Sequence, residues 1–230
     1  MPPLRGASRP LTLARKRAAL RRGDAITDQD TVHALEVELR HLRRESASAD
    51  ESFPLVDPRG RERGLAAPRW LCHLLGLRHA SAHVILVAPN GLLVLQKRSR
   101  DKDTAPGLLD TSVGGHVGAN RTALEAAHAE MGEELGLGRD ALVGPLEPLG
   151  EPFFALDPRR AYVDAEVVTA FLGRLAPGAL DRVRFADGEV SRLVLAPPDE
   201  VWALLGKGDR ALAAGARATF PRVLSVLEGP

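Results

Sequence analysis

The chain has 230 residues, of which 44% are hydrophobic, enough for one sizeable core and a small appendage. Its 31 Lys and Arg nearly balance its 30 Asp and Glu, so no overall basic field indicates a nucleic-acid polymer as partner. A single cysteine, Cys72, excludes an intrachain disulfide and a cysteine-built zinc site. There is no apolar run long enough for a membrane span or a secretory signal. We therefore expect a cytoplasmic protein without a membrane partner.

The first 50 residues differ in composition from the rest. Residues 1–22 contain seven basic residues and no acidic one, which is compatible with an organellar transit peptide or with a plain extension, the reading we favour. Residues 30–45 have a helical pattern, with one apolar stripe formed by Val32, Leu35, Leu39 and Leu42. A helix this short must dock its stripe on the main domain or on a second copy. We expect residues 1–50 to form a helical extension and linker that contributes to a homodimer.

The main domain is expected over residues 51–230 and mixes strands with helices. A short strand at 55–56 precedes a turn, and Pro89-Asn90-Gly91 indicates a hairpin between strands. A helix over 121–135 ends at Gly136. The hairpin strands are predicted at 83–88 and 92–96, further strands at 161–172 and 191–195, and further helices at 198–205 and 209–227. This mixture predicts an α/β sandwich.

The predicted helix over 121–135 carries the most informative pattern. At 100° per residue, Glu130, Glu133 and Glu134 lie within an arc of about 100° on what we expect to be an exposed patch. Three carboxylates so close repel one another, and a hard cation such as Mg²⁺ or Mn²⁺ removes that repulsion. Taken alone, the same residues are also typical of a solvated acidic helix face.

The spacing around these glutamates resembles the Nudix box, G-x5-E-x7-R-E-U-x-E-E-x-G-U, where U is aliphatic. The positions that match in register are Gly115, Glu130, Met131, Glu133, Glu134, Gly136 and Leu137. The resemblance implies a Nudix α/β/α sandwich with a mixed sheet. Two positions depart from the pattern: Arg121 stands for the first glutamate, and Ala129 for the arginine. In the family these two residues pair and orient the metal ligands, and loss of such support commonly costs 10–100-fold in metal affinity or activity.

Beyond the box, residues 55–205 resemble the Nudix branch closest to isopentenyl-diphosphate isomerase. The matching segments are 55–60, 73–79, His83-Val84, 96–102, 106–110, 112–116 and 188–191. In type I isomerases, histidines and glutamates at comparable places hold a metal; here these are His73, His79, His116, Asp164 and Glu166, with the His73–His79 spacing one residue short. The isomerase also needs a cysteine where this chain has Gly114. Hydrolysis therefore ranks above isomerisation.

The resemblance also implies roles at a diphosphate site. Glu130 and Glu134 are the expected catalytic carboxylates, and with Glu133 and the Gly115 carbonyl they are the expected ligands of Mg²⁺ or Mn²⁺. The general base or an extra ligand is expected at Glu189. Arg98 and Lys102 are expected to bind the phosphates of a small-molecule substrate.

The function indicated by these residues is metal-dependent hydrolysis of a diphosphate linkage in a nucleotide or related small molecule. The alternatives are a catalytically weak diphosphate-binding protein and an isomerase-like enzyme. Three aromatic residues, Phe153, Phe154 and Tyr162, either stack a nucleobase or pack in the core.

Overall fold

The structure is a computed structural model of the chain. It describes residues 26–43, 51–102, 104–158, 162–186, 188–207 and 211–227. The basic segment at residues 1–22 and most of the expected linker lie outside these ranges.

A mixed sheet forms the centre of the molecule, and β3 (His79–Val87) is its central strand. Along one edge, β3 pairs antiparallel with three strands in turn: β1 (Ser52–Val56), β6 (Val113–His116) and β4 (Leu93–Arg98). Its other edge pairs in parallel with β9 (Val163–Arg174) over its whole length. From Ser81 to Val87 every residue of β3 is buried, and Val84 to Val87 are apolar, as expected for a strand covered on both faces.

The remaining strands extend the sheet from these partners. β10 (Val190–Ala196) and β5 (Leu109–Asp110) pair with β4, and β2 (Glu62–Pro68) pairs with β1. β7 (Glu147–Pro148) and β8 (Phe153–Pro158) both pair antiparallel with β9. The predicted strands at 83–88, 92–96, 161–172 and 191–195 therefore correspond to β3, β4, β9 and β10.

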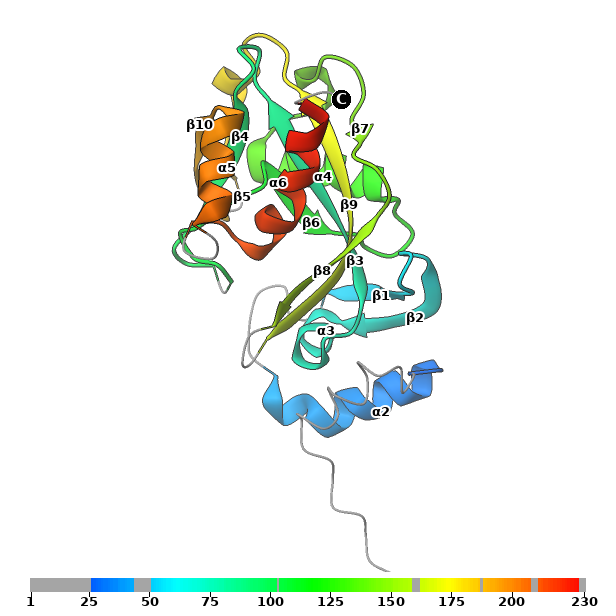
Figure 1. The fold of residues 1–230 in the computed structure, drawn as a ribbon. Helices are drawn as coiled ribbons and strands as arrows, with labels where there is room; N and C mark the ends of the chain where they lie inside the picture. Colours follow the sequence, from blue (N-terminus) through cyan, green and yellow to red (C-terminus); the bar gives the residue numbers. More distant parts are fainter. Residues whose placement is uncertain are drawn as a thin grey trace, which may run out of the picture.

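Helices cover both faces of the sheet (Figure 1). On one face, α4 (Ala123–Leu135) buries Met131 and Leu135 against Val84 and Leu86 of β3. On the opposite face, α5 (Pro198–Gly206) and α6 (Ala214–Leu227) pack against strand residues such as Ile85. Because side chains alternate along a strand, neighbouring residues of β3 serve the two cores. The expected α/β/α sandwich with a mixed sheet is confirmed.

The ends of α4 have local causes. The Thr122 side chain accepts a hydrogen bond from the Glu125 backbone N–H, and the Glu125 carboxylate accepts one from the Thr122 N–H, which makes a capping box. Gly136 ends the helix with a φ of 66°, a conformation that favours glycine. The helix thus begins two residues later than predicted, and Arg121 precedes it.

The N-terminal helix α2 (Gln29–Leu39), followed by a 3₁₀ turn (Arg40–Leu42), packs on its own chain beside β2 and α3 (Arg69–Leu75) (Figure 1). The Gln29 amide donates to the Ala66 carbonyl at 2.9 Å and accepts from the Ala66 N–H at 3.0 Å. Val32 and Leu39 are buried with Trp70, whereas Leu42 is 39% exposed. Part of the stripe therefore docks on its own chain, and a contribution of the helix to a dimer stays a prediction. A homodimer as such stays a prediction.

Candidate active site

One cavity of about 300 Å³ collects most of the residues singled out in the sequence. Its described lining includes two box glutamates of α4, His116 of β6 and the carboxylates of β9. Among the described residues the lining contains eight carboxylates and three Lys or Arg side chains. They are Glu51, Asp110, Glu130, Glu133, Asp157, Asp164, Glu166 and Glu189, with Arg69, Arg98 and Lys102. An anionic substrate would be repelled by this surface unless cations entered with it.

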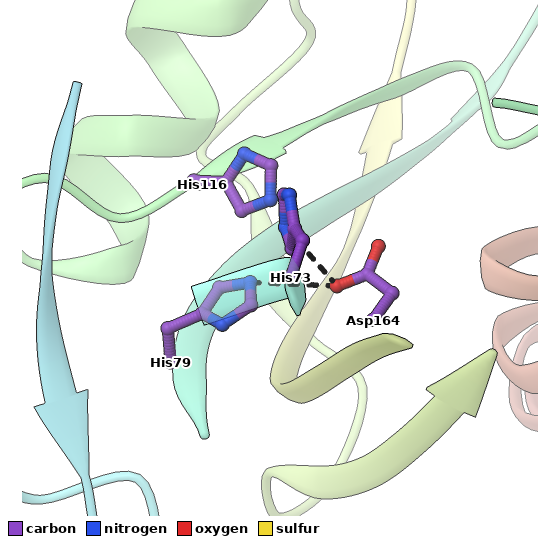
Figure 2. Close-up of side chains that lie close together, drawn as sticks. All are labelled: His73, His79, His116 and Asp164. Atoms are coloured by element: carbon purple, nitrogen blue, oxygen red, sulfur yellow. Dashed lines mark ion pairs between the residues drawn. The ribbon is translucent and has the colours of Figure 1, made fainter. Parts of the chain in front are cut away.

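At one end of the cavity, His73, His79, His116 and Asp164 form a compact group that we call the histidine centre (Figure 2). They come from the consecutive elements α3 and β3 and from β6 and β9, which are distant in the sequence. One potential ligand atom from each lies within 4.8 Å of all the others. A tetrahedral ion with bonds of about 2.1 Å needs its ligands about 3.4 Å apart, so a small inward shift would complete the shell.

Contacts within the histidine centre converge on one carboxylate oxygen. Asp164 Oδ1 lies 3.6 Å from His73 Nε2 and 3.4 Å from His79 Nε2, as the dashed lines of Figure 2 indicate. His79 Nε2, His116 Nε2 and Asp164 Oδ1 are buried without a hydrogen-bond partner. Buried polar atoms without partners are rare and costly. A cation among them would satisfy all three, so the residues present fit a metal ion.

The protonation of the imidazoles suits the same role. Burial lowers the pKa of His73 to about 3 and the pKa of His116 well below its ordinary value, so both rings are neutral at pH 7. In His79, Nδ1 lies 2.9 Å from the Leu77 carbonyl oxygen. Because a carbonyl only accepts, Nδ1 carries a hydrogen, and Nε2 is the ring nitrogen that faces Asp164 and the other histidines. Imidazoles and a carboxylate are typical ligands of Zn²⁺ and similar transition metals.

Aromatic rings enclose the histidine centre. Phe53 of β1 is almost fully buried, and its ring stacks on His79 and His116 with centroid distances of 5.0 Å and 4.3 Å. The Tyr162 hydroxyl lies 3.2 Å from His73 Nε2. Burial raises the pKa of Tyr162, so the group is a neutral phenol that can donate a hydrogen bond.

The box glutamates differ from one another in burial, which corrects the expectation of one exposed patch. Glu133 is exposed and Glu130 half-buried, and both line the cavity. Glu134 is 2% exposed and points into the protein, where Gln96 Nε2 donates to its Oε2 at 3.2 Å. Burial first, and the charges of Glu130 and Glu189 second, raise the pKa of Glu134 well above its ordinary value. Glu134 therefore favours the protonated form until a cation compensates its charge.

Gly115 is required by the position of Glu130. A Cβ added at Gly115 would lie 2.0 Å from the Glu130 carboxyl carbon, so any side chain there would displace the carboxylate. The glycine of the box thus lies directly beneath one of its glutamates. This contact places the Gly115 backbone beside the carboxylate, and its carbonyl stays a predicted metal ligand.

The expected phosphate-binding cations line the cavity, but each is paired with a carboxylate. Arg98 Nη1 lies 3.1 Å from Asp110 Oδ2, and Lys102 Nζ lies 2.5 Å from Glu189 Oε1. Sequence reasoning missed a third cation, Arg69 of α3, because it did not predict that helix. A phosphate group would exchange these carboxylate partners for its own oxygens.

Neither Gly114 nor Cys72 supplies the thiol that the isomerase reaction needs. A Cβ at Gly114 would lie 3.2 Å from Thr111 Oγ1 and 3.4 Å from His83 Cδ2, and the glycine itself carries no thiol. The thiol of Cys72 is buried, its Sγ lies 3.6 Å from the Ala67 carbonyl oxygen, and burial raises its pKa. It does not line the cavity.

The aromatic residues considered for base stacking are dispersed. Phe154 is 50% exposed, and Phe153 lies under the Arg222 guanidinium at 3.5 Å. Of these three aromatic residues only Tyr162 lines the cavity, beside His73. Phe153 and Phe154 therefore do not form a stacking wall in the described part of the site.

Comparison with known proteins identifies the fold family. The family model described as "NUDIX domain" matches residues 77–217, more than half of the chain. The chain belongs to the Nudix family. It is 41% identical to Nudix hydrolase 3 of Arabidopsis thaliana over 90 residues. This aligned segment covers 39% of this chain and 12% of that protein. The chain is 39% identical over 61 residues to an uncharacterized Nudix hydrolase, YfcD, of Escherichia coli, covering 26% of this chain and 34% of the relative. The alignments thus span well under half of these relatives.

Solved structures agree on the fold. The crystal structure of DR0079 from Deinococcus radiodurans matches with a TM-score of 0.58 and 23% identity, over 75% of this chain and 98% of that one. A MutT protein from Methanosarcina mazei matches with a TM-score of 0.51 and 18% identity, over 66% and 96%. Identities this low concern the fold alone. Within the described residues, none of the helices combines the length and apolarity needed to cross a membrane.

Proposed function

We propose that this Nudix protein is a metal-dependent hydrolase of a diphosphate linkage in a nucleotide or related small molecule. The observation that carries the proposal is the cavity, which is lined by Glu130 and Glu133, by His116 and Asp164 of the histidine centre, and by three described cationic side chains. An acidic cavity that also contains cations paired with carboxylates suits a substrate that brings phosphate charge together with metal charge.

The box residues Glu130, Glu133 and Glu134, with the Gly115 carbonyl, would hold Mg²⁺ or Mn²⁺. When bound, the ion supplies charge neutralisation and a more acidic bound water. Glu189 lies beside the cavity and would accept the proton of the attacking water, after Lys102 turns from it to a phosphate oxygen. Arg98 and Arg69 would orient the remaining phosphate oxygens.

We further propose that the histidine centre binds a transition metal, and that the chain lies in the branch closest to isopentenyl-diphosphate isomerase. The grouping of His73, His79 and His116 with Asp164, together with Glu166 whose Oε1 lies 3.5 Å from His116 Nε2, supports this. Isomerase activity itself is opposed by Gly114. A catalytically weak binding protein stays the alternative, because Arg121 and Ala129 replace the orienting pair. Cytoplasmic location, a homodimer and the boundary at residue 50 also stay predictions.

The deciding experiment is a substrate panel with Mg²⁺, Mn²⁺ or chelator. The full-length chain is incubated with ADP-ribose, a nucleoside diphosphate sugar, a dinucleoside tetraphosphate and isopentenyl diphosphate, and the products are separated. We expect metal-dependent cleavage of at least one diphosphate linkage and its loss in Glu130→Gln. Tight binding of these compounds without any cleavage would favour the binding protein, and formation of dimethylallyl diphosphate would favour the isomerase.

A further inference from the structure

A buried amide occupies the middle of the sheet next to the box helix. Gln96 lies on β4, is 1% exposed, and follows the buried residues Val94 and Leu95. Burying an amide in such surroundings is unfavourable unless its polar atoms find partners. Its Nε2 finds one in Glu134 Oε2 at 3.2 Å, 38 residues away in the sequence. The amide therefore connects the sheet to a carboxylate of the box.

A second donor reaches the same carboxylate oxygen. The Gly114 backbone N–H lies 3.4 Å from Glu134 Oε2, so two donors from two different strands converge on this atom. Both of these hydrogen bonds end on Oε2, which leaves Oε1 as the oxygen that can turn to a cation. Fixing one oxygen of a ligating carboxylate orients the other and lowers the entropy lost on metal binding.

The family's usual support for this carboxylate is missing here. Arg121 precedes α4 and lines a separate hollow with Arg59, Gly60 and Thr122, while Ala129 carries no polar side chain. The ion pair that runs along the box helix in related proteins cannot form between these two residues. Gln96 instead approaches the helix from the sheet.

We propose that Gln96 is a positioning residue for Glu134, and that its hydrogen bond substitutes for the orienting ion pair absent at Arg121 and Ala129. The inference rests on the proposed function, because it assumes that Glu134 binds a cation. It goes beyond the proposed function because Gln96 lies outside the box and does not line the cavity.

The test compares Gln96→Met, which keeps the length of the side chain without its donor, with Ser112→Ala. Ser112 is the control because it is equally buried, in the bend between β5 and β6, and its hydroxyl accepts a hydrogen bond from the Leu86 N–H at 2.7 Å and donates one to the Val94 carbonyl, neither of which is part of Glu134. Mn²⁺ binding to full-length protein is followed by electron paramagnetic resonance of the free ion. The Mn²⁺ sites that are lost in Glu130→Gln are assigned to the box. This distinguishes them from any Mn²⁺ bound at the histidine centre.

We expect Gln96→Met to weaken Mn²⁺ binding at the box by about 10–100-fold, and Ser112→Ala to change it by less than about twofold. The Mn²⁺ concentration for half-maximal cleavage of the best panel substrate should shift in parallel, with KM at saturating Mn²⁺ unchanged. Should Gln96→Met not fold, Gln96→Asn, whose amide is one methylene too short, should give the same shift.

Two outcomes would overturn the inference and are distinguishable. If wild-type and Gln96→Met bind box Mn²⁺ equally, Gln96 has only a structural role while the proposed function stands. If Glu130→Gln removes no class of Mn²⁺ sites from the wild-type titration, the box is not a cation site, and the proposed function fails together with the inference.

Discussion

The Tyr162 hydroxyl lies 3.2 Å from Nε2 of His73, the nitrogen that would bind a cation in the histidine centre. In the metal-free protein this contact gives a buried imidazole nitrogen its hydrogen bond. A cation at the same nitrogen has to displace the hydroxyl. Tyr162 and the ion therefore compete for one lone pair.

Tyr162→Phe should consequently strengthen metal binding at the histidine centre. A hydrogen bond of this kind contributes about 1 kcal/mol, which corresponds to about a fivefold increase in affinity. Co²⁺ titration followed by visible absorption measures it, with Phe154→Leu on the neighbouring strand as a control that should bind like wild type. Weaker Co²⁺ binding by Tyr162→Phe would mean that the hydroxyl assists the ion instead of competing with it.

The buried His73 should make the metal-free protein sensitive to acid. Its pKa is about 3 in the folded chain and 6.5 as the ordinary value, so between these limits the unfolded chain binds a proton that the folded chain does not. Stability is therefore lost as pH falls below 6.5, by about 1.4 kcal/mol per pH unit for this one group. Urea unfolding in chelator at pH 7.5, 6.0 and 5.0 should show a steeper loss for wild type than for His73→Leu. An equal loss of stability with falling pH in wild type and His73→Leu would show that the pKa of His73 is not lowered in the folded chain.

Glu134 should have the opposite pH dependence. Because its pKa is raised by burial, the folded chain holds a proton that the unfolded chain releases above 4.5, and stability falls as pH rises. Glu134→Gln removes this loss, so in chelator it should be as stable as wild type near pH 4.5 and more stable at pH 8. Its metal-dependent turnover should nevertheless be lost. A variant that keeps wild-type turnover would exclude Glu134 as a ligand.

The docked N-terminal helix should contribute to stability within one chain. Leu39 is 5% exposed, whereas Val37 on the same helix is 59% exposed. Leu39→Ala should lower the free energy of unfolding by about 2–4 kcal/mol, and Val37→Ala by less than about 0.5 kcal/mol.

Light scattering on full-length protein and on a variant lacking residues 1–43 should give the same number of chains per particle. A dimer that becomes a monomer after the deletion would show that residues 1–43 contribute to the dimer contact.

Local patterns in the sequence predicted much of the fold, because hairpin, capping and box signals depend on residues close together. They failed for α3, β2 and β8, which have no clear period, and with α3 the cation Arg69 was missed. Of the three glutamates that the helical arc grouped, Glu130 and Glu133 line the cavity. The arc could not predict that Glu134 is buried, because that depends on Gln96, which a sheet contact brings from another segment.

The parallel pairing of β3 with β9 has a consequence for the order in which the protein is made. Residues 79 and 166 are register partners, so the central strand cannot complete its second edge until most of the chain has left the ribosome. Asp164 and Glu166 therefore join the histidines late in synthesis. Until then the nascent chain presents His73, His79 and His116 without their carboxylate partners, alongside an unpaired strand edge. The unpaired edge makes a newly synthesised chain vulnerable to aggregation, and the proposed metal site is incomplete until β9 has paired.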